Sequence, residues 1–221
     1  MKRAFALLLV TTVFATQAQG SINLVTDHPN GTPLVVDAGT VSVDKMIVSI
    51  NSDAADLLLG WQTTLWILPT GGTGTVGFNS NVEPVNYVFG TRSGFHFQNL
   101  SFPTTSDGMF AMDAHVDGMG QLLPPVTVPT SPGLNILELD FSASLDASGS
   151  FGVFAVGGAG RSEWTDPGFN AQLFNNINPT PDSHTQIGEI FANPVPEPGT
   201  FALALLALLG LLVHGHRPHR A

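Results

Sequence analysis

The stretch Asn135-Ile-Leu-Glu-Leu-Asp-Phe-Ser-Ala143 alternates apolar and polar residues, and this alternation decides the fold class. Successive side chains of a β-strand point to opposite faces of the sheet. The apolar face of this stretch holds Leu137, Leu139, Phe141 and Ala143. The polar face, which we expect to meet water, holds Glu138, Asp140 and Ser142. The pattern therefore predicts a strand with one side on a hydrophobic core.

A second β-rich run, residues 150–156, follows after the turn sequence Asp146-Ala-Ser-Gly149, and the two runs together predict a hairpin. The run 61–68 places Trp61, Leu65 and Ile67 on one face and Trp66 and Leu68 on the other. Further strand-like runs occur at 41–50, 75–78, 87–89, 95–102, 109–116 and 186–191. No segment has the pattern of a long amphipathic helix. Short strands separated by Gly and Pro predict an all-β fold, an antiparallel β-sandwich of jelly-roll or similar topology.

Composition limits the possible functions. Of 221 residues, 43% are hydrophobic and 11% are charged, which is typical of a folded, weakly charged domain. The formal net charge of −10 disfavours binding to nucleic acid or anionic lipid. The chain has no cysteine, so disulfides, thiolate metal sites and a cysteine nucleophile are excluded.

The N-terminus has the three regions of a secretory signal peptide. Lys2 and Arg3 precede an apolar run at 4–15, and a small, polar stretch follows at 16–20. We expect cleavage after Ala18, with cleavage after Gly20 as the alternative. The predicted domains are a signal peptide at 1–18 and an exported β-sandwich at 19–193.

The C-terminus combines an extended linker, an apolar helix and a basic end. The linker, 194–199, contains Pro196, Glu197 and Pro198, and each proline disfavours helix in the residue before it. Residues 200–213 are almost wholly apolar and predict a single transmembrane helix, although its length of about 21 Å is short for a hydrocarbon core of about 30 Å. Residues 214–221 carry Arg217 and Arg220 and are expected to stay cytoplasmic as a basic tail.

The motif, helix and basic end together resemble the PEP-CTERM family of sorting signals. The resemblance implies that Val195, Pro196, Glu197 and Pro198 form the sorting motif recognised by an exosortase, a membrane cysteine transpeptidase. It also implies anchoring in the inner membrane, processing near the motif, and delivery to the envelope or extracellular matrix of polysaccharide-making bacteria. The chain departs from the family because its two terminal arginines are spread among His214, His216 and His219 instead of clustered.

The middle of the chain loosely resembles cohesin-like and carbohydrate-binding β-sandwiches. The resemblance rests on an early strand run that ends in Leu59-Gly-Trp-Gln62, and on the strand 137–141 followed by Gly149-Ser-Phe151. It implies an antiparallel sandwich and leaves the ligand undetermined, because fold alone does not assign function.

The motifs of common hydrolases are absent from the sequence. It has no Gly-x-Ser-x-Gly and no pair of histidines with zinc-protease spacing, so no catalytic residue and no cofactor is predicted. Glu163, Trp164 and Asp166 are candidates for binding a glycan, with a structural tryptophan that plugs the sandwich edge as the alternative. Asp113, His115 and Asp117 alternate on one predicted strand and form a calcium candidate, although they lack EF-hand spacing and no metal site is assigned.

These features predict a non-catalytic protein of the envelope or extracellular matrix with a structural or interaction role. A glycan-binding module of the exopolysaccharide matrix is one alternative. An exported hydrolase with scattered catalytic residues is the other. The expected partners are the exosortase, the membrane and an exopolysaccharide.

Overall fold

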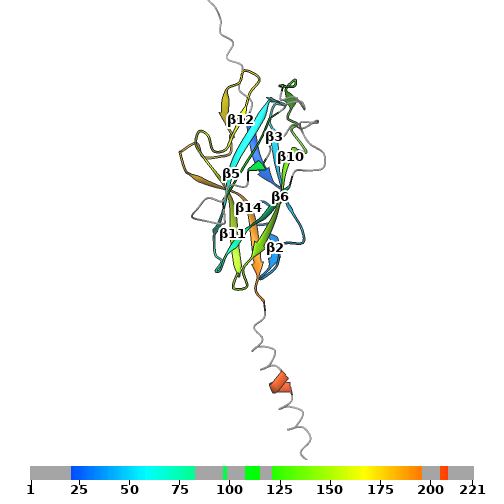
Figure 1. The fold of residues 1–221 in the computed structure, drawn as a ribbon, viewed down its shortest axis with the longest axis vertical. Coiled ribbons are helices and arrows are strands. Elements are labelled where there is room, and N and C mark those ends of the chain that lie inside the picture. Colours follow the sequence, from blue (N-terminus) through cyan, green and yellow to red (C-terminus); the bar gives the residue numbers. More distant parts are fainter. Residues whose placement is uncertain (1–20, 83–96, 99–107, 115–120, 196–204, 209–221) are drawn as a thin grey trace, which may run out of the picture.

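A computed structural model describes residues 21–82, 97–98, 108–114, 121–195 and 205–208 (Figure 1). Strands dominate this part of the chain. Their bounds are β1 (Ile22–Thr26), β2 (Leu34–Asp37), β3 (Met46–Ser52), β4 (Leu57–Leu58), β5 (Gly60–Pro69), β6 (Val76–Val82), β7 (Phe97–Gln98), β8 (Gly108–Ala114), β9 (Val126–Thr127), β10 (Leu134–Ala143), β11 (Gly149–Val156), β12 (Glu163–Thr165), β13 (Ala171–Leu173) and β14 (His184–Asn193).

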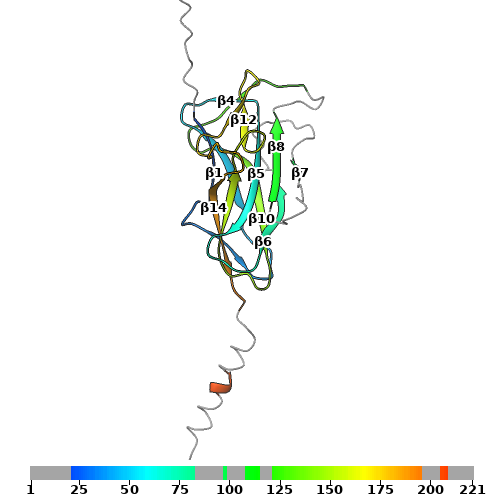
Figure 2. The same cartoon turned by 90° about the vertical axis from the view of Figure 1, so that its left-hand side faces the viewer.

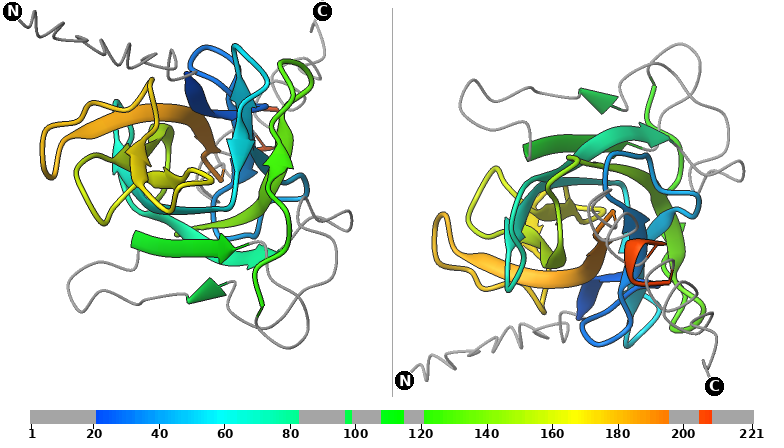
Figure 3. Two further views of the ribbon diagram at one scale, coloured as in Figure 1. Left: turned by 90° about the horizontal axis from the view of Figure 1, so that it is seen from above. Right: turned by 90° about the horizontal axis from the view of Figure 1, so that it is seen from below.

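The strands form two main sheets that face each other across one core (Figures 2 and 3). The smaller sheet has four strands in the order β1-β3-β10-β6. The larger sheet has eight strands and runs β13-β12-β5-β11-β14-β2, with β8 paired to β5 and β7 paired to β8. Neighbouring strands are antiparallel except for β14 and β2, which are parallel. The predicted sandwich is confirmed, and this parallel pair is its departure from a purely antiparallel arrangement.

The alternation in residues 135–143 produces the buried face that it predicts. Leu137, Leu139 and Phe141 of β10 are fully buried, and the Phe141 ring packs against Phe78 of β6 with 5.7 Å between ring centroids. In β5, Trp61, Leu65 and Ile67 are buried on the core side, while Trp66 and Leu68 are half-buried on the other face. Both predicted inward faces are confirmed.

The predicted hairpin between residues 135–143 and 150–156 is wrong. β10 pairs with β3 and β6 in the smaller sheet, whereas β11 pairs with β5 and β14 in the larger sheet. The turn between them therefore crosses from one sheet to the other. The physical reason is that both strands bury an apolar face in the same core, and they do so from opposite sides.

Three further predictions concern the bounds of individual strands. In the run 41–50, regular strand structure begins only at Met46, and Val41 forms an isolated bridge with Ser142. The segment around Trp164 is the short strand β12. The predicted strand at 87–89 and most of 95–102 lie outside the described residues.

The predicted signal peptide and most of the predicted membrane helix also lie outside the described residues. Residues 205–208 are helical. Among the residues that the structure describes, no helix is both long and apolar enough to cross a membrane.

Truncating Phe141 should test the shared core. Phe141→Ala removes a fully buried ring, so the free energy of unfolding is expected to fall by about 3–5 kcal/mol. The exposed Val41→Ala in the neighbouring segment should change it by less than about 0.5 kcal/mol. Urea unfolding followed by tryptophan fluorescence measures both. Equal, small effects of the two substitutions would contradict the assigned core.

Candidate functional site

The predicted glycan-binding residues gather at the end of the sandwich where β12 pairs with β5. The register places Trp164 opposite Trp61 and Glu163 opposite Gln62. Because side chains alternate along a strand, Trp164 points toward the core and Glu163 toward the outer face of the larger sheet. Asp166 follows β12 directly and begins the turn to β13.

The two tryptophans belong to the core. Trp61 and Trp164 are each only 4% exposed. Neither indole N–H has a hydrogen-bond partner in the described part of the chain. Leaving a buried donor unpaired costs about 1–3 kcal/mol of stability. A ring that is covered to this extent offers almost no face to a sugar. Sugar stacking on Trp164 therefore stays a prediction, and it requires a conformational change that exposes the ring.

Glu163 is held on the outer face by two donors. Its Oε1 accepts a hydrogen bond from Gln62 Nε2 at 2.8 Å, and its Oε2 accepts one from the backbone N–H of Gly160 at 3.0 Å. An ionised carboxylate has about four acceptor positions. Glu163 therefore has a fixed orientation and retains acceptor capacity for a ligand.

Asp166 organises the turn between β12 and β13. Its carboxylate accepts hydrogen bonds from the backbone N–H groups of Gly168 and Asn170 at 2.8 and 2.9 Å, and from the side chains of Asn170 and Gln172. Desolvation by burial raises the pKa of Asp166, but the hydrogen bonds from Asn170, Gln172 and Gly168 outweigh it and hold the pKa below its usual range. These donors occupy the carboxylate, so its principal role here is structural.

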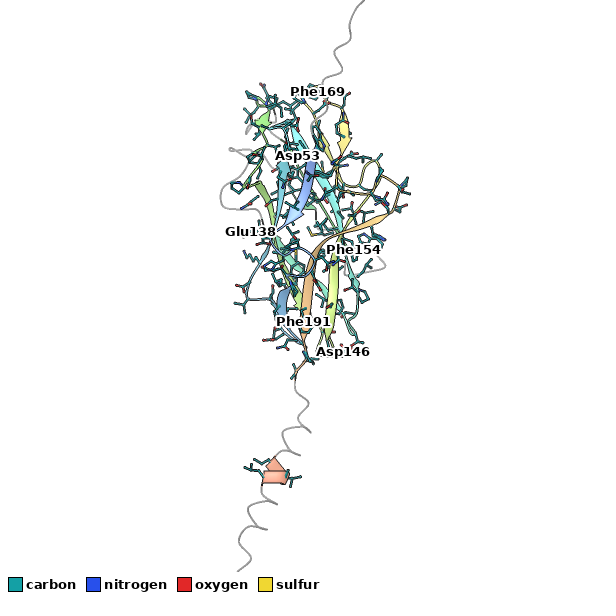
Figure 4. All side chains as sticks on the ribbon, turned by 180° about the vertical axis from the view of Figure 1, so that it is seen from behind. Asp53, Glu138, Asp146, Phe154, Phe169 and Phe191 are labelled. Atoms are coloured by element: carbon teal, nitrogen blue, oxygen red, sulfur yellow. The ribbon has the colours of Figure 1, made fainter. Side chains whose placement is uncertain are left out.

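This turn presents Phe169, which our sequence predictions did not include. Phe169 is 67% exposed and has a φ of 63°, a left-handed conformation that costs a side-chain-bearing residue about 1–2 kcal/mol. Its N–H donates to the carbonyl of Asp166 at 3.0 Å. Figure 4 shows Phe169 at the extreme end of the sandwich, away from the C-terminal segment. The turn sequence Pro167-Gly-Phe-Asn170 contained the available signal, since it places an aromatic residue among turn formers.

A pocket of about 170 Å³ lies beside Phe169, between β5, β8 and β12. We call it the distal pocket. Its lining includes Gln62, Met112, Asp113, Leu122, Glu163 and Phe169. Met112, Leu122 and Phe169 are exposed apolar side chains, while Glu163 adds a fixed carboxylate. The distal pocket can therefore contact a ligand through apolar surface and a hydrogen-bond acceptor at once.

A second depression, of about 500 Å³, lies at the sandwich edge formed by β1 and β13. It is lined by Ser21, Ile22, Trp164, Ala171, Gln172, Leu173 and Asn175. Nearby, the Asn176 side chain accepts from the Leu24 N–H at 2.9 Å and donates to the Leu24 carbonyl at 2.7 Å. It thereby satisfies backbone groups of β1 at the sheet edge.

The outer face of the larger sheet carries an aromatic cluster of Trp66, Phe154 and His184. Trp66 and Phe154 are register partners on β5 and β11. The His184 ring lies 5.3 Å from the Trp66 ring and 6.3 Å from the Phe154 ring. With the distal pocket, this cluster gives the outer face several aromatic groups that a partner could contact.

The calcium candidate is only partly described. Asp113 lies on β8 opposite Trp61, is largely buried, and accepts a hydrogen bond from the Ala114 N–H at 2.7 Å. His115 and Asp117 lie outside the described residues. Within the part of the chain that the structure describes, no group of three or more His, Cys, Asp or Glu could hold a metal ion.

Comparison with known proteins identifies the tail. Residues 194–217 match the family model described as the PEP-CTERM protein-sorting motif, as the Pro-Glu-Pro sequence predicts. The match begins at the residue after the end of β14. None of the curated proteins is a significant sequence match.

The sandwich is similar in fold to solved structures of cohesin modules. A chain from a crystal structure of a dockerin–cohesin complex at pH 5.5 is 12% identical with a TM-score of 0.50, covering 78% of this chain and 100% of its own. The sixth cohesin of scaffoldin B from Acetivibrio cellulolyticus is 12% identical with a TM-score of 0.49, covering 78% and 99%. A chain from a cohesin–dockerin complex of Clostridium thermocellum is 10% identical with a TM-score of 0.49, and the match covers 78% of this chain and 99% of that one. At these identities the likeness concerns the fold alone.

Removing the Asp166 charge should weaken the sandwich in a pH-dependent way. Asp166→Asn is expected to lower the free energy of unfolding by about 1 kcal/mol at neutral pH, because an amide has one acceptor oxygen instead of two. The folded-state pKa is depressed, so the carboxylate's contribution is present above the unfolded pKa and is lost as the pH falls through the folded pKa. The difference from wild type in urea unfolding should therefore stay constant from neutral pH down to the unfolded pKa, about 3.9, and shrink as the pH falls further.

The exposed Asp44→Asn provides the matched control, since it removes one carboxylate elsewhere on the surface. It should show no comparable loss at neutral pH. A difference between Asp166→Asn and wild type that stays constant over the whole pH range would contradict the role given to the Asp166 carboxylate.

Proposed function

We propose that the chain is an exported, non-catalytic protein that a PEP-CTERM tail delivers to the cell envelope or extracellular matrix, where it binds a partner. The observation that carries this proposal is the sorting motif at 194–217, which directly follows the last strand of a cohesin-like sandwich. A sorting motif of this kind implies export. The motif therefore determines where the sandwich is delivered, and the sandwich provides the binding surface.

The proposed route has three steps. The signal peptide at 1–18 directs residues 19–193 across the inner membrane. The helix at 200–213 and the basic tail at 214–221 then hold the chain in that membrane. An exosortase recognises Val195, Pro196, Glu197 and Pro198 and processes the chain near this motif. The shortness of the apolar run is consistent with a temporary anchor.

The proposed interaction surface is the outer face of the larger sheet, with the distal pocket at one end. Exposed Phe169, Leu122 and Met112 supply apolar contact area there, and Glu163 supplies a fixed acceptor. Exposed aromatic residues on braced turns are effective contact groups because little conformational freedom is lost when they bind.

A second candidate function is the binding of an exopolysaccharide at the same pocket. Glu163 next to the exposed ring of Phe169 favours it, since sugars bind through ring stacking and hydrogen bonds to carboxylates. Trp164, Glu163 and Asp166 remain the predicted glycan residues. Glu163 is the one of them whose side chain lies on the outer face and keeps acceptor capacity.

Replacing the Pro-Glu-Pro motif should prevent processing. The variant with Pro196, Glu197 and Pro198 changed to alanine is expected to keep its C-terminal tail in cells that contain the exosortase, as measured by intact mass and fractionation. The matched control is Pro179→Ala with Pro181→Ala, which removes an exposed Pro-x-Pro of the sandwich. Unchanged mass and location in the motif variant would refute the sorting proposal.

Glycan binding can be tested on an array of bacterial polysaccharides probed with the full chain. Phe169→Ser is expected to reduce the signal roughly tenfold, equivalent to about 1.4 kcal/mol of lost contact. The control is Phe191→Ser, which removes an exposed phenylalanine at the opposite end of the sandwich (Figure 4). Equal signals from the two variants would eliminate the distal pocket as a glycan site.

A further inference from the structure

Most of the exposed large apolar side chains of the sandwich lie near its two ends. One group surrounds the distal pocket region and comprises Leu57, Met112, Leu122, Phe169 and Leu173. The other group comprises Val35, Val41, Leu145, Phe191 and Val195. We call this second group the tail-end rim, because it surrounds the point where the chain leaves β14.

Backbone contacts place the tail-end rim around this exit. The Asn193 carbonyl, at the end of β14, accepts a hydrogen bond from the Ala38 N–H at 2.9 Å, and the neighbouring Gly39 N–H donates to Ala143 at 2.9 Å. Leu145 packs directly over Gly39, since a Cβ at Gly39 would lie 2.5 Å from Leu145 Cδ2. Leu145 is nevertheless 79% exposed.

The other members of the rim lie close to the same point. Val35 and Phe191 are register partners on β2 and β14, two positions before the Asp37 and Asn193 pair. Val41 bridges Ser142, next to the end of β10. Figure 4 shows Phe191 and Asp146 at the end of the sandwich from which the C-terminal segment departs.

The length of the linker keeps this end close to the membrane. From Val195 to Phe201, where the apolar run begins, the chain spans at most about 20 Å when fully extended. The headgroup layer on each side of a bilayer occupies roughly 5–8 Å of that distance. With the tail anchored as proposed, the tail-end rim is the part of the sandwich that faces the bilayer, and it lies within reach of its surface.

Charges near the rim indicate which lipid surface it fits. Asp37, the register partner of Asn193, and Asp146 are exposed at this end of the sandwich. A rim with these carboxylates is repelled by anionic headgroups. Its apolar side chains therefore suit a zwitterionic lipid surface.

We infer that, before the tail is cut, the tail-end rim rests on the zwitterionic headgroup region of the membrane through Leu145, Val35 and Phe191. This inference rests on the proposed anchoring of the tail. The contact holds the sandwich upright, so that the distal pocket points away from the membrane. It also holds the sorting motif at a defined height next to the bilayer, where a membrane enzyme can bind it.

The absence of native cysteine allows a direct test with the full chain. A fluorescent label is attached through Asp146→Cys at the tail end, or through Ala54→Cys near Asp53 toward the other end, both exposed positions. The chain is inserted into phosphatidylcholine vesicles that carry a headgroup quencher. The label at position 146 is expected to lose most of its fluorescence, and the label at position 54 little.

The combined variant Val35→Thr, Leu145→Ser, Phe191→Ser should lower the quenching at position 146 toward the level at position 54. The matched combination Leu57→Ser, Leu122→Ser, Phe169→Ser, which changes exposed apolar residues of the other end, should leave it intact. Vesicles rich in phosphatidylglycerol should quench position 146 less than phosphatidylcholine vesicles do.

Flotation with the vesicles separates the two proposals. If the chain does not float, the anchoring proposal fails, and the rim contact fails with it. If the chain floats but position 146 is quenched no more than position 54, anchoring stands and the rim contact is overturned. Energy transfer between differently labelled copies at position 146, without headgroup quenching, would assign the rim to a second copy and also overturn the inference.

Discussion

Two strands that follow each other in the chain, β10 and β11, bury their apolar faces against one core from opposite sheets. This shared burial determines much of the remaining architecture. Because β11 pairs with β14, the last strand runs back toward the turn between β10 and β11. The C-terminal segment therefore leaves the sandwich beside that turn, and Leu145 lies close to the exit.

The same arrangement gives the molecule two different ends. The tail end bears the exit of the chain and the tail-end rim. The distal end bears β12 (Figure 1) and the exposed Phe169 in the turn that follows it (Figure 4). A protein attached through one end and binding through the other needs this separation, because a pocket next to the anchor would face the lipid. The positions of the sorting motif and of the distal pocket are thus consistent with a single role as a displayed binding module.

Sequence patterns predicted the strands with strong alternation, β5 and β10, together with their inward faces. They could not assign β10 and β11 to sheets, because one buried face per strand is equally compatible with a hairpin and with two facing sheets. At the site, Glu163 and Asp166 were identified as notable residues, but the hydrogen bonds that make Asp166 structural are contacts within a turn that spacing does not reveal. Phe169 was missed because its exposure depends on a left-handed backbone conformation.

The tail was the most predictable feature, because its recognition depends on local sequence and needs no tertiary contact. The proposed function therefore depends most on export and sorting of the intact chain. The most direct measurement is the intact mass of the protein recovered from the envelope of a cell that contains the exosortase. We expect a chain that begins after Ala18 or Gly20 and ends near Val195 to Pro198. A full-length mass, with both ends present, would contradict it.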